Sequence, residues 1–306
     1  MISGLISKVL DIDSNELRAV LSSFLLVSLL MGSYYMLRPI RDSLASEWSD
    51  TEVSLLWTFT FIFSAVAVLL YGYVASKIRF DRLVSSVYGA FAVCFVLFYF
   101  STSNFHLEIF SNKSFYVLVS VYSLFHVSVF WSLMSEVFSK AQAKRLFGFI
   151  GAGASTGAVL GPLTAALLAG SIGNQLLLLG ASLIIIATIP LILFIQARAN
   201  SEFSDSDSKT SPSKNASIGG TTLDGFKFIF SERLLLGIAL FIFLATTLSS
   251  LIYFEIKNIL SGIEPDARTQ IWAGIDFVVN ILAITIGAFV TGRITKMLGL
   301  SFSLSL

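Results

Sequence analysis

The sequence has little charge, little histidine and almost no cysteine. Only 13% of its 306 residues are charged and 55% are hydrophobic, whereas a soluble domain carries about 25% charged residues. So few charges leave too little polar surface to cover a globule surrounded by water. The composition therefore excludes a soluble domain and predicts an integral membrane protein.

The scarce residues also exclude several kinds of site. The single cysteine, Cys94, excludes an internal disulfide framework and a cysteine-clustered metal site, and two histidines argue against a zinc site. The net charge is only +1, so nothing indicates nucleic acid as a partner. The sequence offers no nucleophile–base pair and no phosphate-binding loop, so we expect neither an enzyme nor a bound cofactor.

Long apolar runs make up most of the chain. In lipid only helices and closed barrels satisfy the backbone, and about 18 apolar residues in a row are typical of a transmembrane helix. The runs are continuous rather than alternating, which argues against a barrel. We therefore expect an all-α integral membrane protein with about eight spans. The predicted spans are Ala19–Leu37, Val53–Val74, Leu83–Phe100, Phe115–Met134, Phe147–Ala169, Gln175–Ile195, Leu234–Phe254 and Gln270–Val290.

The basic residues predict the orientation of these spans. With a cytoplasmic N-terminus, fifteen of the twenty Lys and Arg residues lie in inside segments and five in outside segments. Because basic residues are enriched on the cytoplasmic side, we expect a cell (inner) membrane protein with its N-terminus inside. Residues 1–18 lack the pattern of a signal peptide and are interpreted as an amphipathic segment at the membrane surface.

One polar stretch divides the chain. Residues 199–220 are rich in Ser, Asp, Lys, Gly and Pro, which predicts a flexible cytoplasmic linker. Six spans precede it within residues 19–198, a layout typical of two-halved carriers. Residues 221–306 hold two further spans and the start of a third, so we expect the beginning of a second half. On this interpretation eight of twelve spans are present and the chain is truncated.

An internal repeat supports the two-halved interpretation. A shift of the chain by 216 positions superposes the first two spans on the seventh and eighth without a gap. Charged residues in three loops then coincide: Arg41 with Lys257, Asp50 with Asp266, and Lys77 with Arg293. The repeat therefore predicts one cation from each half at equivalent positions.

Charged residues in or beside the spans are candidates for binding, because burying a charge in lipid costs several kcal/mol unless it is paired or hydrated. Arg41 and Lys257, facing each other, suit a small anionic substrate such as a phosphate or carboxylate. The alternative is that these basic side chains reach out to the lipid headgroups. The full candidate set for substrate binding is Arg38, Arg41, Asp42 and Lys257.

Three further residues are candidates for ion or proton coupling. Asp276 lies inside the eighth span, and Glu255 ends the seventh. His126 lies near the middle of the fourth span, where a histidine relays protons in some transporters. The alternatives are that Asp276 only pairs with a cation and that His126 is a neutral histidine bonded within the bundle.

The fifth span carries a stripe of small residues, every fourth one, that allows another backbone to approach closely. Within it, Gly157 and Gly161 precede Pro162, a pattern that resembles the fifth-helix motif of facilitator-type antiporters. The alternative interpretation is plain helix packing. The stripe consists of Gly153, Gly157, Gly161, Ala165 and Ala169.

The loop after the second span contains Lys77 and Arg79 and resembles the G-x-x-x-D-R-x-G-R-K loop of the major facilitator superfamily, whose basic residues help to latch the inner side. Ser76 replaces the usual acid, and ordinary positive-inside charge is the alternative. Lys144 and Arg145 are candidates for a similar gating or packing role, and Glu136 is expected to pair with Lys140, Lys144 or Arg145.

Two segments resemble the ATP/ADP translocase family of nucleotide transporters. The segment Leu37–Leu44 is similar to its first-helix element L-R-x-x-K-D-x-L. Phe130-Trp131, followed by Ala143-Lys144-Arg145-Leu146-Phe147-Gly148, is similar to its F-W…E-A-K-R-F-Y…G segment. The resemblance implies a twelve-helix facilitator-like fold that exchanges nucleotides.

Within that resemblance, Arg41 occupies the position of a lysine that contributes to nucleotide transport. Arginine at this position retains the positive charge of the lysine. The family's fourth-helix glutamate falls near Val119, which cannot replace it, and its late-helix lysine falls beyond Leu306. We therefore expect a secondary transporter for a nucleotide or a related anionic metabolite. The alternatives are a proton-coupled exporter of another small molecule and an inactive, truncated membrane protein.

Overall fold

The computed structural model describes residues 16–101, 108–202, 231–291 and 297 of the chain. The chain divides into two units, residues 203–262 and the remainder. The larger unit contains α2 (Leu17–Ala45), α3 (Asp50–Ala75), α4 (Phe80–Ser101), α5 (Glu108–Val137), α6 (Lys140–Glu202), α9 (Pro265–Thr285) and the short π-helix η2 (Ile286–Thr291). The described part of the smaller unit contains α8 (Arg233–Ile259).

The expectation of an all-α membrane protein is confirmed. Within the described residues, seven helices are long and apolar enough to cross a membrane. They contain the first seven predicted spans, and the eighth, Gln270–Val290, runs from α9 into η2. Residues 1–15 of the predicted amphipathic segment and 203–220 of the predicted linker lie outside the described residues. The helices extend slightly beyond the predicted spans, since α2 already begins at Leu17 and α6 continues to Glu202.

The helix α6 contains two predicted spans because the chain turns inside it. A straight helix of its 63 residues would be about 95 Å long, whereas the hydrocarbon core of a bilayer is about 30 Å thick. At Gly173 the backbone leaves the helical region, with φ 80° and ψ 161°. Only glycine adopts such a positive φ at little cost. Gly173 therefore separates a first limb, 140–172, from a second limb, 174–202.

Local sequence signals begin two of the helices. Ser49 caps α3 through a reciprocal pair of hydrogen bonds, in which Ser49 Oγ accepts from the Glu52 amide and Glu52 accepts from the Ser49 amide. Glu264 caps α9, whose first residue is Pro265. These two caps fix where the chain enters α3 and α9.

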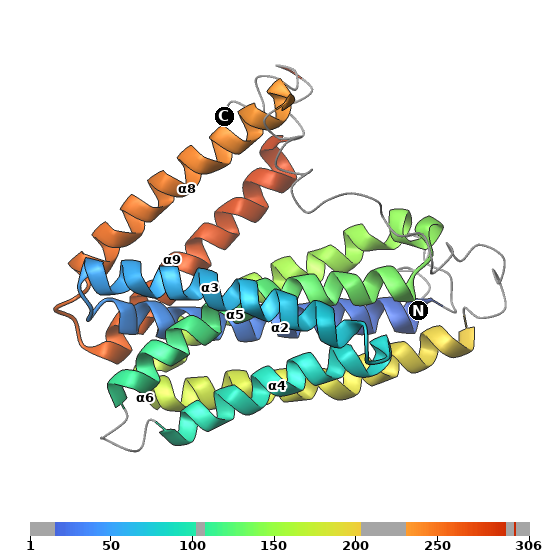
Figure 1. The fold of residues 1–306 in the computed structure, drawn as a ribbon, viewed down its shortest axis with the longest axis horizontal. Coiled ribbons are helices and arrows are strands. Elements are labelled where there is room, and N and C mark those ends of the chain that lie inside the picture. The colour runs from blue at the N-terminus through green and yellow to red at the C-terminus, as the bar shows by residue number, and fades with distance from the viewer. Residues whose placement is uncertain (1–15, 102–107, 203–230, 292–296, 298–306) are drawn as a thin grey trace. The chain divides into compact units, whose positions relative to one another are not determined.

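The larger unit is a bundle in which α2 packs against α5, α6 and α9, while α4 packs against α5 and α6 (Figure 1). Its interior is rich in aromatic side chains. Tyr88, Phe95 and Phe130 are fully buried, and Phe95 meets the ring of Tyr122 edge-on at 5.5 Å. We use "proximal end" for the end of this bundle where α2 begins, and "distal end" for the end where α2 ends and α9 begins.

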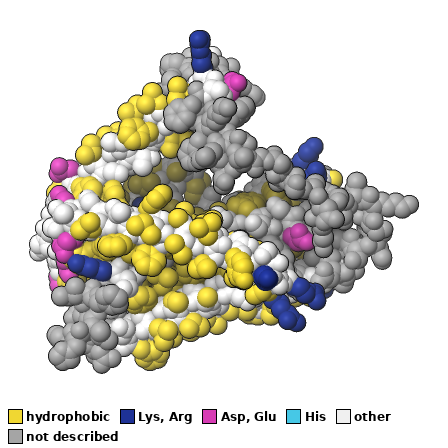
Figure 2. Space-filling view, in the orientation of Figure 1, with side chains coloured by type: hydrophobic (Ala, Val, Ile, Leu, Met, Phe, Trp, Pro, Cys, Tyr) yellow, Lys and Arg dark blue, Asp and Glu magenta, His cyan; other side chains and the backbone are white. Residues whose placement is uncertain are grey.

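The surface of the bundle is apolar, as lipid contact requires. Large hydrophobic side chains such as Phe61 and Leu69 on α3 are about three-quarters exposed. Figure 2 shows hydrophobic side chains along the middle of the helices of the larger unit, and charged side chains nearer to their ends. This distribution is typical of a protein whose middle lies in hydrocarbon and whose ends lie in water.

Candidate functional site

Four charged side chains of α2 and α9 form one connected network. Arg38 Nη1 lies 3.1 Å from Asp276 Oδ1, and Arg38 Nε lies 3.6 Å from Asp42 Oδ2. Arg41 bonds the other oxygen of Asp42 through both Nε, at 2.9 Å, and Nη2, at 2.7 Å. The network holds two cations and two anions, so its charges balance, as buried charges require.

Arg41 is held from the side by α5. Its Nη1 donates to Ser120 Oγ at 3.3 Å, and its guanidinium carbon lies 5.3 Å from the centre of the Tyr116 ring. Trp57 of α3 donates in turn to the Tyr116 hydroxyl at 2.7 Å. These partners lie far from Arg41 in the sequence and carry no charge, so nothing in the charge pattern indicates them.

A second polar network fastens the start of α9 to the end of α2. Ser43 Oγ donates to the Pro265 carbonyl at 2.8 Å and accepts from Arg268 Nε at 3.2 Å. Arg268 also pairs with Glu47, and Trp272 Nε1 donates to Ser46 Oγ at 3.2 Å. This network was not predicted from the sequence, and it holds Asp276 beside Arg38 by fixing the helix that carries it.

The hollows among the described residues of the larger unit include a groove along the helices that carry the arginines. It has a volume of about 460 Å³ and is lined by α2, α6, α9 and η2, and its lining contains none of Arg38, Arg41 and Asp276. Its walls are mostly small or apolar, and its polar side chains are Tyr35, Ser155 and Asn280. Tyr35 lies one helical turn before Arg38, and Asn280 lies one turn after Asp276. The groove therefore runs along the same two helices as the charged network.

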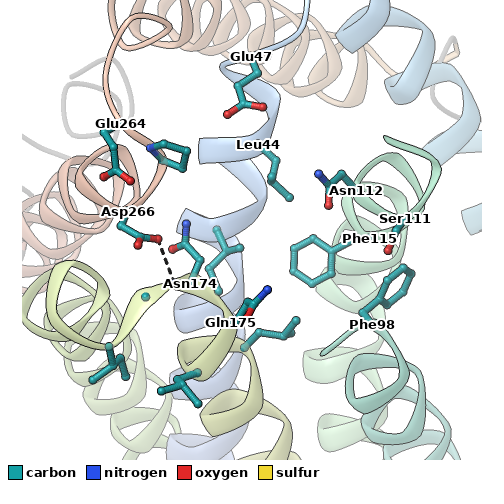
Figure 3. Close-up of a pocket in the computed structure, with 16 residues that line it drawn as sticks. Leu44, Glu47, Phe98, Ser111, Asn112, Phe115, Asn174, Gln175, Glu264 and Asp266 are labelled. Atoms are coloured by element: carbon teal, nitrogen blue, oxygen red, sulfur yellow. Dashed lines mark hydrogen bonds between the residues drawn. The ribbon is translucent and has the colours of Figure 1, made fainter. Parts of the chain in front are cut away.

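The larger hollow, of about 560 Å³, lies at the distal end and contains neither arginine. Figure 3 shows Asp266 against the turn of α6, where its Oδ1 accepts a hydrogen bond of 3.0 Å from the backbone N–H of Asn174. The aromatic rings of Phe98 and Phe115 lie on the other side of the hollow (Figure 3). The hydrogen bond between Asn174 and Asp266 anchors the start of α9 on the Gly173 turn.

The three coupling candidates have different surroundings. Asp276 is buried and ion-paired with Arg38. His126 is buried on α5, where its Nδ1 lies 3.1 Å from the Tyr122 carbonyl oxygen and its ring stacks on Tyr34 at 4.6 Å. Within the described part of the chain, His126 Nε2 has no hydrogen-bond partner. Glu255 is exposed on α8.

Lys257 lies in the last turn of α8, in the smaller unit. Arg38, Arg41, Asp42 and Asp276 all belong to the larger unit. The geometry therefore brings four of the predicted residues together, while the pairing of Arg41 with Lys257 across a binding site stays a prediction.

The stripe of small residues on the first limb of α6 packs against α2. A side chain added at Gly153 or Gly161 would come within 2.5 Å of the carbonyl oxygen of Phe24 or Gly32, and one at Gly157 would overlap the carbonyl of Ser28. Ser28 Oγ also donates to the Gly153 carbonyl at 2.9 Å. Gly157 and Gly161 thus serve helix packing here, followed by Pro162 inside α6. The small residues Ser28 and Gly32, four apart, are the signal of the complementary surface.

The basic residues of the proximal end differ in their contacts. Arg145 pairs with the buried Glu16 at 2.9 Å, and Gln142 donates to the same carboxylate at 2.8 Å. Glu136, the expected partner of Lys140, Lys144 or Arg145, is exposed, and the described carboxylate partner of Arg145 is Glu16 at the start of α2. Lys77 lies over the Tyr73 ring at 5.7 Å. Arg79 follows in the turn before α4, and Lys144 is exposed in the first turn of α6.

The fold and the charged network define a multi-pass membrane protein with ionised side chains inside its bundle. The family model of the Major Facilitator Superfamily matches residues 23–306, so the chain belongs to that family. It is therefore a member of a family of secondary membrane transporters. No curated protein and no solved structure matches the chain. Among the described residues, no group of His, Cys, Asp and Glu side chains is arranged to hold a metal ion.

Proposed function

We propose that this transporter carries a nucleotide or a related anionic metabolite by alternating access. The observation that carries the proposal is the pair Arg38 and Arg41, two guanidinium groups on one helix inside a membrane bundle. Arginine binds phosphate and carboxylate groups through paired N–H donors, and it keeps its charge in a buried site. A cation inside a bundle is costly in lipid, so its presence supports a role in binding.

The resemblance of Leu37–Leu44 to the ATP/ADP translocases supports a nucleotide as the anion. Arg41 stands where that family has a lysine, and Lys257 is the second cation in the proposal. The groove beside Tyr35 and Asn280 supports a small-molecule substrate, since its volume of about 460 Å³ lies within the range of about 300–1,000 Å³ that is usual for small-molecule sites.

Uptake into proteoliposomes tests the proposal. The full chain is reconstituted, and uptake of labelled ATP, inorganic phosphate, choline and glucose is compared. We expect ATP to be taken up and the cation choline and the neutral glucose to be excluded. Uptake of choline or glucose at the rate of ATP would contradict anion transport, and uptake of phosphate alone would contradict the nucleotide assignment.

A second candidate function is proton-coupled export of another small molecule. It is favoured by Asp276, whose buried carboxyl group lies about 16 Å along α9 from the first residue of that helix, Pro265. A carboxyl group inside a membrane bundle that gains and loses a proton provides coupling. Under this candidate an imposed pH gradient drives transport, and Asp276→Asn abolishes that response. Exchange that depends on internal ADP and ignores the pH gradient would reject it.

We also propose that the protein lies in the cell inner membrane with its N-terminus in the cytoplasm. The excess of Lys and Arg in alternate loops supports this orientation. Cysteine labelling tests it in whole cells, in a Cys94→Ser background. A cysteine at Lys113 should react with an impermeant maleimide, while one at Lys144 should react only after the cells are opened. The reverse pattern would contradict the orientation.

A further inference from the structure

The two arginines of α2 differ in how many contacts their guanidinium groups make with the rest of the protein. Arg41 bonds Asp42 through Nε and Nη2 and Ser120 through Nη1, and the Tyr116 ring covers its face. Its side chain is only 12% exposed. An anion that approached Arg41 would have to displace several protein contacts at once.

Arg38 is more open. Its side chain is 33% exposed, and its closest ionic contact is a single one, from Nη1 to Asp276 at 3.1 Å. The contact from Nε to Asp42 Oδ2 is longer, at 3.6 Å, and the Tyr35 ring lies 5.9 Å from the guanidinium carbon. The carboxylate of Asp276, from a different helix, is therefore the closest ionic partner that an incoming anion would displace from Arg38.

The groove lies beside residues that share a helix face with this pair. On α2, Met31, Tyr35 and Arg38 lie on one face because their spacing is four and three residues. On α9, Asp276, Asn280 and Ala283 lie on one face for the same reason. Met31, Tyr35, Asn280 and Ala283 line the groove, and one helical turn beyond Tyr35 and Asn280 the same two faces carry Arg38 and Asp276. Arg41 instead contacts α5.

We infer that Arg38 is the side chain that binds the substrate anion, and that Asp276 is the carboxylate the anion displaces. Arg41 is then a positioning residue: it holds Asp42 and keeps that carboxylate from capturing Arg38. The inference rests on the proposed transport of an anionic substrate and names the contact that recognises it. It also assigns Asp276 a role in every transport cycle, as the group that occupies Arg38 whenever the substrate is absent.

Equilibrium binding to the purified full chain tests the inference, with ATP and inorganic pyrophosphate as probes in isothermal titration calorimetry. Asp276→Asn keeps the size of the side chain and removes its charge, so we expect the anion Kd to fall about tenfold or more. Arg38→Gln/Asp276→Asn removes the pair together, and we expect binding of both probes to be lost. The matched control is Lys113→Gln/Glu52→Gln, which also removes one cation and one anion, from an ion pair outside the charged network, and should keep the Kd within about threefold of wild type.

Arg41→Gln alone separates positioning from a merely structural role. It leaves Asp42 free to draw Arg38 away, so we expect a weaker Kd that the second change, Asp42→Asn, restores. Thermal unfolding of each variant confirms that it is folded before binding is compared.

Three results would overturn the inference: an Asp276→Asn protein that binds neither probe, a Kd that this change leaves unaltered, and binding that survives removal of Arg38 but not of Arg41. The proposed nucleotide function fails differently. In that case Asp276→Asn binds pyrophosphate more tightly than wild type does, while neither protein exchanges ATP for ADP in liposomes.

Discussion

The buried carboxylate of Asp42 lies between two guanidinium groups, and its position determines how both arginines of α2 are held. Removing one member of such a pair leaves the other charge buried without a counterion, which costs more than removing both. The same reasoning applies at the proximal end, where Glu16 accepts from Arg145 and Gln142. At the scale of single residues, stability inside this bundle therefore depends on matched charges.

Asp42→Asn should destabilise the protein more than the double change Arg41→Gln/Asp42→Asn. We expect the single change to cost about 1–3 kcal/mol, because Arg41 keeps its charge and loses a carboxylate with which it makes two close contacts. The stabilities of the two variants are compared by their midpoints of thermal unfolding in detergent. Equal midpoints would show that Arg41 does not depend on Asp42 for its burial.

Glu16→Gln should lower the unfolding midpoint by a few degrees, since Arg145 and Glu16 form a partly buried, charge-assisted pair worth about 1–3 kcal/mol. Glu136→Gln is the matched control, because Glu136 is exposed and its replacement should leave the midpoint unchanged. A larger effect at Glu136 than at Glu16 would contradict the described pairing of Arg145.

At the scale of helices, the close approach of α2 and the first limb of α6 organises the larger unit. The glycines of α6 lie against the backbone of α2. A Cβ atom at Gly153, Gly157 or Gly161 would overlap a carbonyl oxygen of α2. In lipid, where burial of apolar surface drives little association between helices, such backbone proximity is a main source of attraction. The α2–α6 pair in turn supports α9, which contacts both helices.

Gly157→Ala should separate these two helices and destabilise the protein by about 1–3 kcal/mol, as overpacking does elsewhere. Gly151→Ala is the matched control in the same limb, because a side chain there would meet no atom within 4 Å. Its unfolding midpoint should be unchanged or slightly raised, since alanine favours the helix. Tolerance of alanine at Gly157 would refute the close packing of α2 on α6.

The packing of α9 on α6 can be tested by cross-linking two introduced cysteines. Cys94 is the single cysteine of the chain, so a Cys94→Ser background has none. The Gln270 side chain would lie within 3 Å of a side chain at Gly170. Cysteines at Gly170 and Gln270 should therefore be joined by a short bifunctional maleimide, and should hold the two fragments together after cleavage at a protease site placed within residues 205–215. Cysteines at Gly170 and Val279 are the control, because Val279 lies on the exposed side of α9. Cross-linking of the control pair alone would exclude the described packing.

At the scale of the whole molecule, the spans were predictable and many of the contacts were not. Lipid forces a continuous apolar run to become a helix, so the eight spans follow from hydropathy alone. The turn at Gly173 falls between the predicted fifth and sixth spans, where Gly170, Gly173 and Asn174 interrupt the apolar run. The sequence indicates Arg38, Arg41 and Asp276 because charge is rare in a span. It does not indicate Ser120, Tyr116 or Glu16, because a single sequence does not tell which distant residues meet in the bundle.

The measurement that tests the account most directly is uptake of labelled ATP into proteoliposomes that are loaded with ADP or left empty. Wild type, Arg38→Gln and, as a control outside the charged network, Arg198→Gln are compared. We predict that internal ADP accelerates uptake by wild type and Arg198→Gln, and that Arg38→Gln loses this acceleration while remaining folded. Uptake by Arg38→Gln at the wild-type rate, with the same response to ADP, would contradict the account.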